Sequence, residues 1–283
     1  MRLLLCTAAV AAAAWLSPSG AAAGVLDRAK DTGTIRLGYR ADAVPFSFDD
    51  PTGLPAGYSV ELCKSVVEAA RAATGRADLR VEWRRLGTED RFDALAHGEI
   101  DLMCSADTVT LGRREQVDFS LPTFVAGASL LYRADGPSSF EALAGQKVGV
   151  RASTTTEDLL RKNLARSGID AEIVPVPSHD EGVRRLAAGE LAAYFGDGPI
   201  LLFQLVKSPD RQRLKLSEVT LDVEVYALAL PKGDDAFRLL ADRTLARLYR
   251  SHEIERVFLA SFGPEAHPSS LLSALYILSA LPE

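Results

Sequence analysis

The chain has 283 residues, of which 25% are charged and 47% are hydrophobic. It is long enough for one large domain or two smaller ones. Its formal net charge is −6 at pH 7, whereas binding to a nucleic-acid backbone needs clustered cations. The composition therefore excludes a general nucleic-acid surface, and the short basic run at residues 211–215 (RQRLK) does not provide one.

Residues 1–23 have the features of a cleavable signal peptide. Arg2 supplies a positive start, residues 3–16 form an apolar core, and residues 21–23 (AAA) fit the small-residue cleavage rule. A membrane anchor is the less favoured alternative, because the apolar stretch is short and ends in Pro-Ser-Gly. We therefore expect export and cleavage before Gly24.

Two cysteines remain after such a cleavage, Cys63 and Cys104. In an oxidising compartment, a pair of this kind is a disulfide candidate. The alternative is two separately buried thiols, which behave as small hydrophobic side chains. The sequence leaves both alternatives open.

The first half of the remaining chain alternates between strand and helix patterns. One predicted helix, residues 57–74, has an apolar face at helical spacing. That face consists of Val60, Cys63, Val66, Val67 and Ala70. The order strand, helix, strand, helix, strand predicts a parallel sheet with right-handed crossovers. Its segments are residues 35–39, 57–74, 79–86, 89–99 and 100–104.

A second unit of the same kind lies between two extended stretches, residues 124–134 and 224–234. Its strands and helices are predicted at residues 147–151, 154–168, 171–176, 179–190 and 191–197. Two further helices are expected at residues 235–252 and 253–263. Two α/β units joined by two extended connections predict two lobes with a cleft between them, which is a preferred place for a ligand.

Five segments together resemble one known family. They are TIRLGYRADAVPFSF, GYSVELCKSVVEAA, GEIDLMCSADTVTLGRREQVDFSLP, GQKVGVRASTT and LAAGELAAYFGD. The second and third are the specific ones. The chain resembles the periplasmic amino-acid-binding proteins of ABC importers, the bacterial extracellular solute-binding family 3. Within that family, GYRADAVPFSF resembles the glutamate/aspartate-binding subgroup.

This resemblance implies an α/β fold of two lobes, the type II periplasmic binding protein fold, with two crossover strands and a ligand cleft between the lobes. Lobe 1 is expected to comprise residues 24–130 and 225–263, and lobe 2 residues 131–224. Residues 264–283 are expected to form a helical tail packed on a lobe, and a role in contacting a permease or a membrane is less favoured. Its predicted apolar face is Leu271, Leu275, Leu278 and Leu281.

The carboxylate of a free amino acid suits a guanidinium fork with hydroxyl or backbone donors beside it. By the resemblance, Arg113 matches the family's carboxylate-clamping arginine and Thr108 the threonine that assists it. Ala106, in the same segment, offers only backbone groups. The alternative for Arg113 is an exposed charge at the start of a helix.

The ammonium of an amino acid needs an acidic or carbonyl acceptor, and Asp197 matches the family's ammonium-binding acid. An aspartate before glycine is also common in strand-end turns. In lobe 2, Ser153, Thr154 and Thr155 open a helix whose N–H groups are expected to bind the ligand carboxylate. Ordinary N-capping is the alternative. Arg151 departs from the smaller polar residues that the family has there.

The other end of the ligand is expected to meet Arg40, Arg91, Thr88 and His179. In glutamine binders of the family the position of Arg40 tends to be acidic or polar. In glutamate/aspartate binders an arginine there reaches the side-chain carboxylate. Arg91 resembles a second such arginine with Thr88 as its hydroxyl partner, and His179 matches a histidine at the same end. Taken singly, Arg91 is also typical of a helix surface, and His179 of a residue beside an N-cap.

Asp107 lies where the family has an apolar or hydroxyl residue. Facing the cleft, it would oppose a dicarboxylate or pair with Arg40 or Arg91. Facing away, it would have no effect on the ligand. The sequence leaves its orientation open.

These observations predict a monomeric, periplasmic substrate-binding component of an amino-acid ABC importer, with a free acidic or polar amino acid (glutamate or aspartate) as ligand and an inner-membrane permease as partner. No cofactor or metal is expected, since zinc spacing, a phosphate loop and a nucleophile elbow are missing from the sequence. Two alternatives remain on the same fold, a periplasmic enzyme like the cyclohexadienyl dehydratases and a ligand-sensing binding protein.

Overall fold

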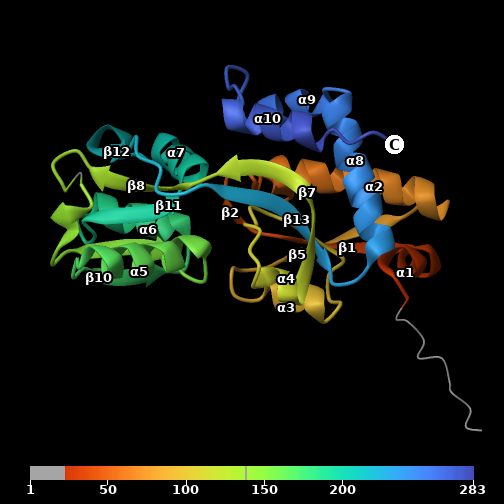
Figure 1. Cartoon of the computed structure of the whole chain (residues 1–283), viewed down its shortest axis with the longest axis horizontal. Coiled ribbons are helices and arrows are strands. Elements are labelled where there is room, and N and C mark those ends of the chain that lie inside the picture. The colour runs from red at the N-terminus through yellow and green to blue at the C-terminus, as the bar shows by residue number, and fades with distance from the viewer. Residues whose placement is uncertain (1–22, 138) are drawn as a thin grey trace, which may run out of the picture.

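The computed structural model describes residues 23–137 and 139–283. The predicted signal peptide lies outside the described residues, except for Ala23. The chain folds into two α/β lobes that lie side by side along the long axis of the molecule (Figure 1). We define lobe 1 and lobe 2 by the two five-stranded sheets described below.

Lobe 1 contains a sheet with the strand order β5-β1-β6-β13-β7. β1 is parallel to β5 and β6, and β13 is antiparallel to β6 and β7. The strands are β1 (Thr34–Tyr39), β5 (Arg80–Arg85), β6 (Leu102–Cys104), β7 (Val117–Ala126) and β13 (Glu224–Pro231). A small antiparallel sheet accompanies them, made of β2 (Asp42–Ala43), β3 (Ser47–Asp49) and β4 (Pro55–Ala56). The helices are α1 (Val25–Thr32), α2 (Tyr58–Thr74), α3 (Arg91–Ala96), α4 (Arg113–Gln116), α8 (Asp235–Arg250), α9 (Glu253–Phe262) and α10 (Ser270–Ser279).

Lobe 2 contains a sheet with the strand order β10-β9-β11-β8-β12. β9 is parallel to β10 and β11, while β8 is antiparallel to β11 and β12. The strands are β8 (Ala128–Arg133), β9 (Lys147–Arg151), β10 (Glu172–Val176), β11 (Ala193–Asp197) and β12 (Leu214–Leu216). The helices are α5 (Thr155–Ser167), α6 (His179–Ala187) and α7 (Gly198–Lys207), with the 3-10 turns η1 (Glu141–Leu143) and η2 (Arg211–Arg213). The predicted two-lobe α/β architecture is thereby confirmed.

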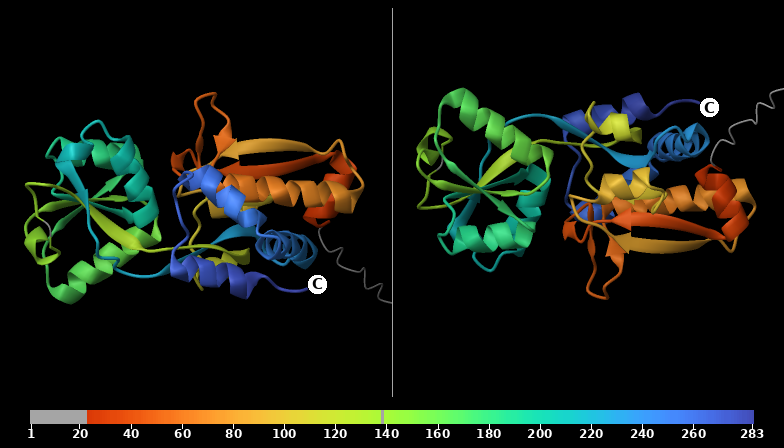
Figure 2. Two further views of the ribbon diagram at one scale, coloured as in Figure 1. Left: turned by 90° about the horizontal axis from the view of Figure 1, so that it is seen from above. Right: turned by 90° about the horizontal axis from the view of Figure 1, so that it is seen from below.

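The chain passes between the lobes where β7 leads into β8 and again where it enters β13 (Figures 1 and 2). β7 ends at Ala126 and β8 begins at Ala128, whereas the predicted change of lobe lies after residue 130. The two passages touch at Gly127, where a Cβ atom would collide with the backbone oxygen of Asp222. The backbone N–H of Ala128 also donates to Asp222 Oδ1 at 2.7 Å. This close packing allows glycine only and holds the two connections together.

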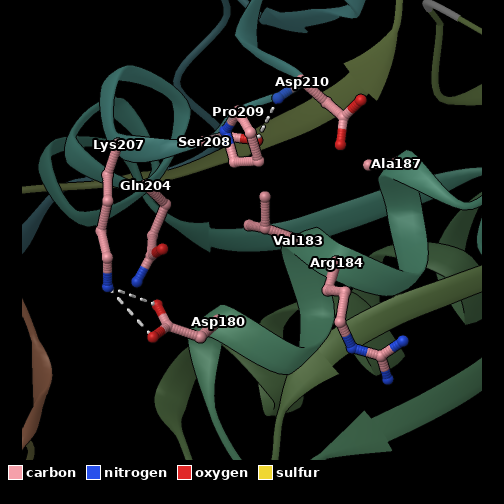
Figure 3. Close-up of a pocket in the computed structure, with 9 residues that line it drawn as sticks. All are labelled: Asp180, Val183, Arg184, Ala187, Gln204, Lys207, Ser208, Pro209 and Asp210. Atoms are coloured by element: carbon pink, nitrogen blue, oxygen red, sulfur yellow. Dashed lines mark hydrogen bonds and ion pairs between the residues drawn. The ribbon is translucent and has the colours of Figure 1, made fainter.

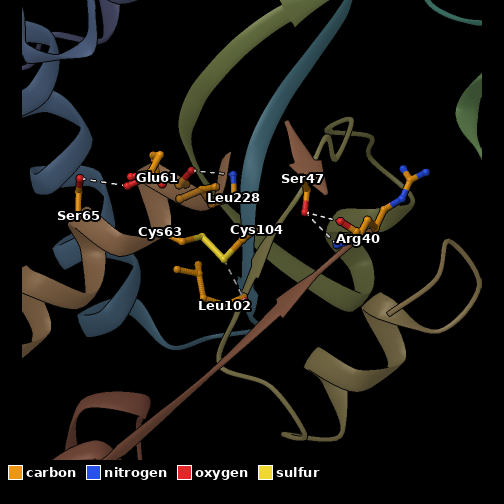
Figure 4. Close-up of a disulfide and its surroundings, with 9 residues drawn as sticks. Arg40, Ser47, Glu61, Cys63, Ser65, Leu102, Cys104 and Leu228 are labelled. Atoms are coloured by element: carbon orange, nitrogen blue, oxygen red, sulfur yellow. Dashed lines mark hydrogen bonds between the residues drawn. A yellow bond between two sulfur atoms is a disulfide. The ribbon is translucent and has the colours of Figure 1, made fainter. Parts of the chain in front are cut away.

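The core of lobe 1 forms around α2, whose predicted apolar face is buried. Cys63 of this helix and Cys104 at the end of β6 are joined by a disulfide, with Cα atoms 6.0 Å apart (Figure 4). Of the two alternatives for these cysteines, the structure therefore has the bonded one. It fixes α2 over β6, the strand that leads directly into the segment containing Thr108.

The C-terminal tail packs on lobe 1 as a helix, but the predicted face is wrong. Leu272 and Tyr276 of α10 are buried, and the hydroxyl oxygens of Tyr276 and Tyr58 are 2.8 Å apart. Of the predicted leucines, Leu275 is partly buried against the core, while Leu271, Leu278 and Leu281 are 53%, 78% and 49% exposed. Tyr276 takes the inner position because its ring packs on Tyr249 and its hydroxyl meets a buried partner. Within the described ranges, no helix is long and apolar enough to cross a membrane.

Candidate ligand site between the lobes

The predicted site residues follow the carboxyl ends of parallel strands in both sheets. In lobe 1, Arg40 follows β1, Thr88 and Arg91 follow β5, and the segment from Ala106 to Arg113 follows β6. In lobe 2, Thr155 follows β9, His179 follows β10, and Asp197 ends β11. Open α/β sheets bind ligands in the crevice outside the carboxyl ends of their strands. The two edges face each other, so the structure brings the predicted residues together from both lobes.

Side-chain contacts connect the two edges directly. Thr88 Oγ1 donates to the backbone oxygen of Ala152 at 2.9 Å. The hydroxyl oxygens of Thr108 and Thr155 are 3.2 Å apart, and Arg151 reaches Asp42 in an ion pair. The structure therefore has the lobes closed on one another, with the hydroxyl of Thr88 used between lobes.

At one end of the interface stands a cation without a carboxylate partner. Arg113 is half-buried, and its Nη1 donates to the backbone oxygen of Thr108 at 2.7 Å. Its guanidinium lies over the ring of Phe92, 5.0 Å from the centroid. No ion pair within the described residues involves Arg113. The remaining donors of this fork suit an incoming carboxylate.

Two carboxylates of the interface also lack a cation. Asp197 Oδ1 accepts from Thr156 Oγ1 at 3.0 Å. Glu224, at the start of β13, accepts from Thr108 Oγ1 at 3.0 Å and is 5% exposed. Burial and the charge of Asp197 raise the pKa of Glu224 to about 7. Neither carboxylate forms an ion pair in the part of the chain that the structure describes. A buried and a half-buried acid that both lack a counter-ion suit an ammonium group.

The far end of the interface is built on Asp42, which the sequence analysis did not identify. Arg40 donates from Nε to Asp42 Oδ1 at 3.0 Å, and its Nη2 lies 2.8 Å from the same oxygen. Arg151 donates from Nε to Asp42 Oδ2 at 2.9 Å. Burial alone would raise the pKa of Asp42, but the neighbouring guanidinium charges hold it well below its usual range. Arg151 also lies 3.4 Å from Glu89, but that carboxylate is 56% exposed. In the buried part of the group, two cations therefore share one anion, which leaves one positive charge for a ligand.

His179 lies beside this group and is 3% exposed. Burial lowers its pKa to about 4, so the imidazole is neutral at pH 7. The hydroxyl of Tyr194 is 3.0 Å from His179 Nδ1, and burial raises the pKa of Tyr194. A tyrosine that keeps its proton can donate to Nδ1, and the imidazole then presents Nε2–H as a neutral donor.

Arg91 pairs with Asp107, which settles the orientation of that aspartate. Arg91 Nε donates to Asp107 Oδ1 at 2.6 Å, and both side chains are buried, at 2% and 0% exposed. Burial lowers the pKa of Arg91 to about 10, so it remains a cation at pH 7. Arg91 Nη1 also donates to the backbone oxygen of Thr88. Thr88 is thus a partner of Arg91 through its carbonyl.

The three predicted site residues at the start of α5 have different roles in the structure. Thr154 is the N-cap, accepting from the backbone N–H of Glu157 at 3.2 Å. Ser153 is exposed, has a positive φ of 57°, and donates its N–H to the Glu157 side chain. Thr155 faces Thr108 in lobe 1. Ala106 is buried at 6% exposed and has only backbone groups to offer.

Buried polar atoms that lack a hydrogen-bond partner gather at this interface. Within the described residues these atoms are Arg40 Nη2, Ser105 Oγ, Asp107 Oδ2, Tyr226 Oη and, elsewhere, Arg238 Nε. Arg40 Nη2 lies near Asp42 without the alignment of a hydrogen bond. Native proteins leave few such atoms unsatisfied, and a bound ligand is one group that satisfies them.

A model of the bacterial extracellular solute-binding proteins, family 3, matches residues 35–264. The chain belongs to this family. The match spans both sheets and every predicted site residue.

Two named relatives are each 30% identical in sequence to this chain. An L-glutamate/L-aspartate-binding protein of Pseudomonas aeruginosa is 30% identical over 250 residues, 88% of this chain and 83% of that protein. A glutamate/aspartate import solute-binding protein of Salmonella typhimurium is 30% identical over 252 residues, 89% of this chain and 83% of that protein. Among solved structures, an ancestral amino-acid-binding protein described as a precursor of cyclohexadienyl dehydratase is 26% identical, with a TM-score of 0.73 over 84% of this chain and 99% of that chain.

The sequence analysis did not identify three residues at this solute-binding protein's interface as site residues. They are Asp42, Arg151 and Glu224. Asp42 stands two positions after Arg40, and only the turn into β2 brings it back to that guanidinium. Arg151 was noted only as a departure from the family's small residues. Glu224 starts a strand whose pattern reads as core. Its approach to Thr108 depends on the pairing of distant segments, which no local pattern predicts.

A separate surface pocket lies in lobe 2 between α6 and α7 (Figure 3). Its volume is about 180 Å³, and an ion pair between Lys207 and Asp180, 3.0 Å apart, lies beside it. None of the predicted site residues lines it. Ligand pockets are usually larger, roughly 300–1,000 Å³, and this pocket has no role in the site described above. No cluster of metal-ligating side chains occurs among residues 23–137 and 139–283.

Proposed function

We propose that this solute-binding protein is the periplasmic component of an amino-acid ABC importer and binds glutamate or aspartate between its lobes. The named relatives, which are glutamate/aspartate-binding proteins, support this ligand class. The proposal includes a monomeric protein, export through residues 1–23, and an inner-membrane permease that receives the ligand.

The observation that carries the proposal is the pattern of uncompensated charge around Thr108. Arg113 contacts its backbone oxygen and has no carboxylate partner. Glu224 contacts its hydroxyl and, with Asp197, has no cation. An unpaired guanidinium and an unpaired carboxylate on one residue, with the charge of Asp197 acting on that carboxylate, match the carboxylate and ammonium that every amino acid carries.

The side-chain preference follows from the charges at the opposite end. Arg40 and Arg151 share Asp42, and the second carboxylate beside Arg151, that of Glu89, is exposed to solvent, so the buried part of this group carries one excess positive charge. His179 is neutral and adds a donor without adding charge. A second carboxylate on the ligand balances this excess, whereas a neutral side chain leaves it buried and uncompensated. The arrangement therefore favours a dicarboxylic amino acid.

The test is titration calorimetry with L-glutamate, L-aspartate, L-glutamine and L-asparagine. We expect the acidic pair to bind at least about tenfold more tightly than the amides, the difference that one hydrogen bond to a charged group provides. Binding of no amino acid would contradict the function. Equal or tighter binding of the amides would contradict the acidic preference.

One observation favours a second function, an enzyme like the cyclohexadienyl dehydratases. A buried carboxyl group with a pKa of about 7, as Glu224 has, is suited to act as a general acid. The ancestral protein named above is a binding protein described as a precursor of such an enzyme. Incubation with prephenate and arogenate, with detection of the aromatic product, separates the two functions. We expect no turnover, and product formation that disappears in Glu224→Gln would establish the enzyme instead.

A further inference from the structure

Glu224 occupies a position on the crossover strand that contacts both lobes. It begins β13 immediately after the chain returns from lobe 2. Its Oε2 accepts from Thr108 Oγ1 at 3.0 Å, and Thr108 is 3.2 Å from Thr155 of lobe 2. The carboxyl group therefore lies where lobe 1, lobe 2 and the connection between them meet.

The surroundings of Glu224 are anionic. Asp197 approaches from β11, where Thr156 holds its Oδ1 at 3.0 Å. Asp222 lies two residues before Glu224, where its Oδ1 accepts from the N–H of Ala128, and it adds a further negative charge. Burial and the charges of Asp197 and Asp222 all raise the pKa of Glu224, and the hydroxyls of Thr155 and Thr108 lower it. At neutral pH, Glu224 is thus divided between its neutral and charged forms.

The hydroxyl of Tyr226 is a second observation that points to a ligand group beside Glu224. It stands two residues along β13 from Glu224, so both side chains leave the strand on the same face. Its ring is 1% exposed, and within the described part of the chain its hydroxyl lies near the Asp197 carboxylate without a well-aligned hydrogen bond to any partner. Burial and the charges of Asp197 and Glu224 raise the pKa of Tyr226, so the hydroxyl remains protonated beside both carboxylates.

We propose that Glu224 is a second acceptor for the ligand ammonium, together with Asp197, and that ligand binding drives a proton off Glu224. This inference rests on the proposed function. The protonated Glu224 carboxyl loses its proton to solvent when the ammonium arrives, and the resulting carboxylate pairs with that ammonium. No bond to the ligand forms or breaks. Closure of the lobes is thereby linked to the ionisation of one residue.

The other titratable groups near the site do not produce the same effect near pH 7. His179 has a pKa of about 4 and stays neutral. Tyr226 stays protonated because its pKa is raised. The remaining carboxylate on this strand segment, Asp222, accepts from the N–H of Ala128 and acts on Glu224 through its charge, which raises the pKa of Glu224.

The experiment is calorimetry of L-glutamate and L-glutamine binding near pH 7 in two buffers with different ionisation enthalpies. We expect release of about half a proton at a pH equal to the pKa of the free group, for both ligands, because both carry the ammonium. Affinity should rise about tenfold from about pH 6 to about pH 8. Glu224→Gln should remove both effects and weaken binding on the order of tenfold. Asp222→Asn should retain proton release but move its maximum to lower pH, because it removes a charge that raises the pKa of Glu224.

Each outcome decides the inference. Binding of wild type without proton release overturns it and leaves the proposed function intact, as does equal proton release in Glu224→Gln. Failure of every amino acid to bind overturns the proposed function and this inference together. The wild-type measurement in two buffers does not depend on whether a variant folds.

Discussion

Arg151, at the end of β9 in lobe 2, donates from Nε to Oδ2 of Asp42 in lobe 1 at 2.9 Å. The other oxygen of the same carboxylate accepts from Arg40 of lobe 1 at 3.0 Å. One carboxylate thus ties together a guanidinium from each lobe. Arg151 also lies 3.4 Å from Glu89. These contacts join the two lobes, so they link closure to the end of the site that is expected to meet the ligand side chain.

Replacing Arg151 with glutamine should weaken both closure and binding of an acidic ligand. The change removes one of two cations around Asp42 and leaves no excess positive charge there. We expect glutamate affinity to fall about tenfold to a hundredfold, the range for one hydrogen bond to a charged group. Small-angle scattering at saturating ligand should show a less compact particle. Arg184→Gln is the control, since Arg184 pairs with Glu181 on the surface of lobe 2, and equal behaviour of the two variants would reject the bridging role.

Replacing Arg113 with alanine should weaken the binding of every amino acid by a similar factor. The change removes the guanidinium expected to hold the carboxylate that all of them share. The loss should be at least about 1.5–3 kcal/mol, the range for a charge-assisted hydrogen bond. Arg114→Ala is the matched control, because Arg114 is the neighbouring arginine and is exposed. Near-normal calorimetric affinity in Arg113→Ala would remove Arg113 from the site.

Breaking the Cys63–Cys104 disulfide should lower the stability of lobe 1 without removing ligand contacts. The sequence separation of 41 residues corresponds to a loss of about 4 kcal/mol of unfolding free energy in the chain-entropy description. The measurement is denaturant unfolding of the oxidised protein and of the Cys63→Ala/Cys104→Ala double variant. Two free thiols in the denatured, periplasmically expressed wild type would show that the bond is not formed.

The packing of the C-terminal helix can be tested with two leucines of α10. Leu272 is 1% exposed and Leu278 is 78% exposed. Leu272→Ala should cost about 2–5 kcal/mol by leaving a cavity in the core, whereas Leu278→Ala should change stability by less than about 0.5 kcal/mol. Thermal unfolding of both variants is the measurement. A larger loss for Leu278 would restore the face that the sequence predicts.

Much of the fold was predictable because the spacing of apolar residues agrees with the positions of the residues that end helices and strands. The strand predicted at residues 147–151 and the helix predicted at residues 57–74 match β9 and α2 within one residue. α7 was missed because its sequence, GPILLFQLVK, is apolar throughout the middle and has no amphipathic period. The tail shows a different limit. Leucine spacing identified a helix, but the buried hydroxyl contact of Tyr276 selects which face turns inward.

The site was predictable where a residue matches a motif of the family and less so where geometry alone creates the contact. Arg40 and Asp197 were placed at strand ends, and the structure has both at the interface. Asp107 could not be oriented, because its partner Arg91 lies 16 residues away on another segment. Glu224 was missed because 116 residues separate it from Thr108. What those residues bind remains a prediction.

The measurement that tests the account most directly is calorimetry of wild type and Arg40→Gln with glutamate, aspartate, glutamine and asparagine. Arg40 is 3% exposed, and its Nη2 still lacks a hydrogen bond. Glutamine at this position keeps a donor and removes the charge. We predict that the variant loses about 1.5–3 kcal/mol of affinity for the acidic pair and much less for the amides. If wild type ignores acidic ligands, or if Arg40→Gln weakens all four equally, the acidic-ligand account is contradicted.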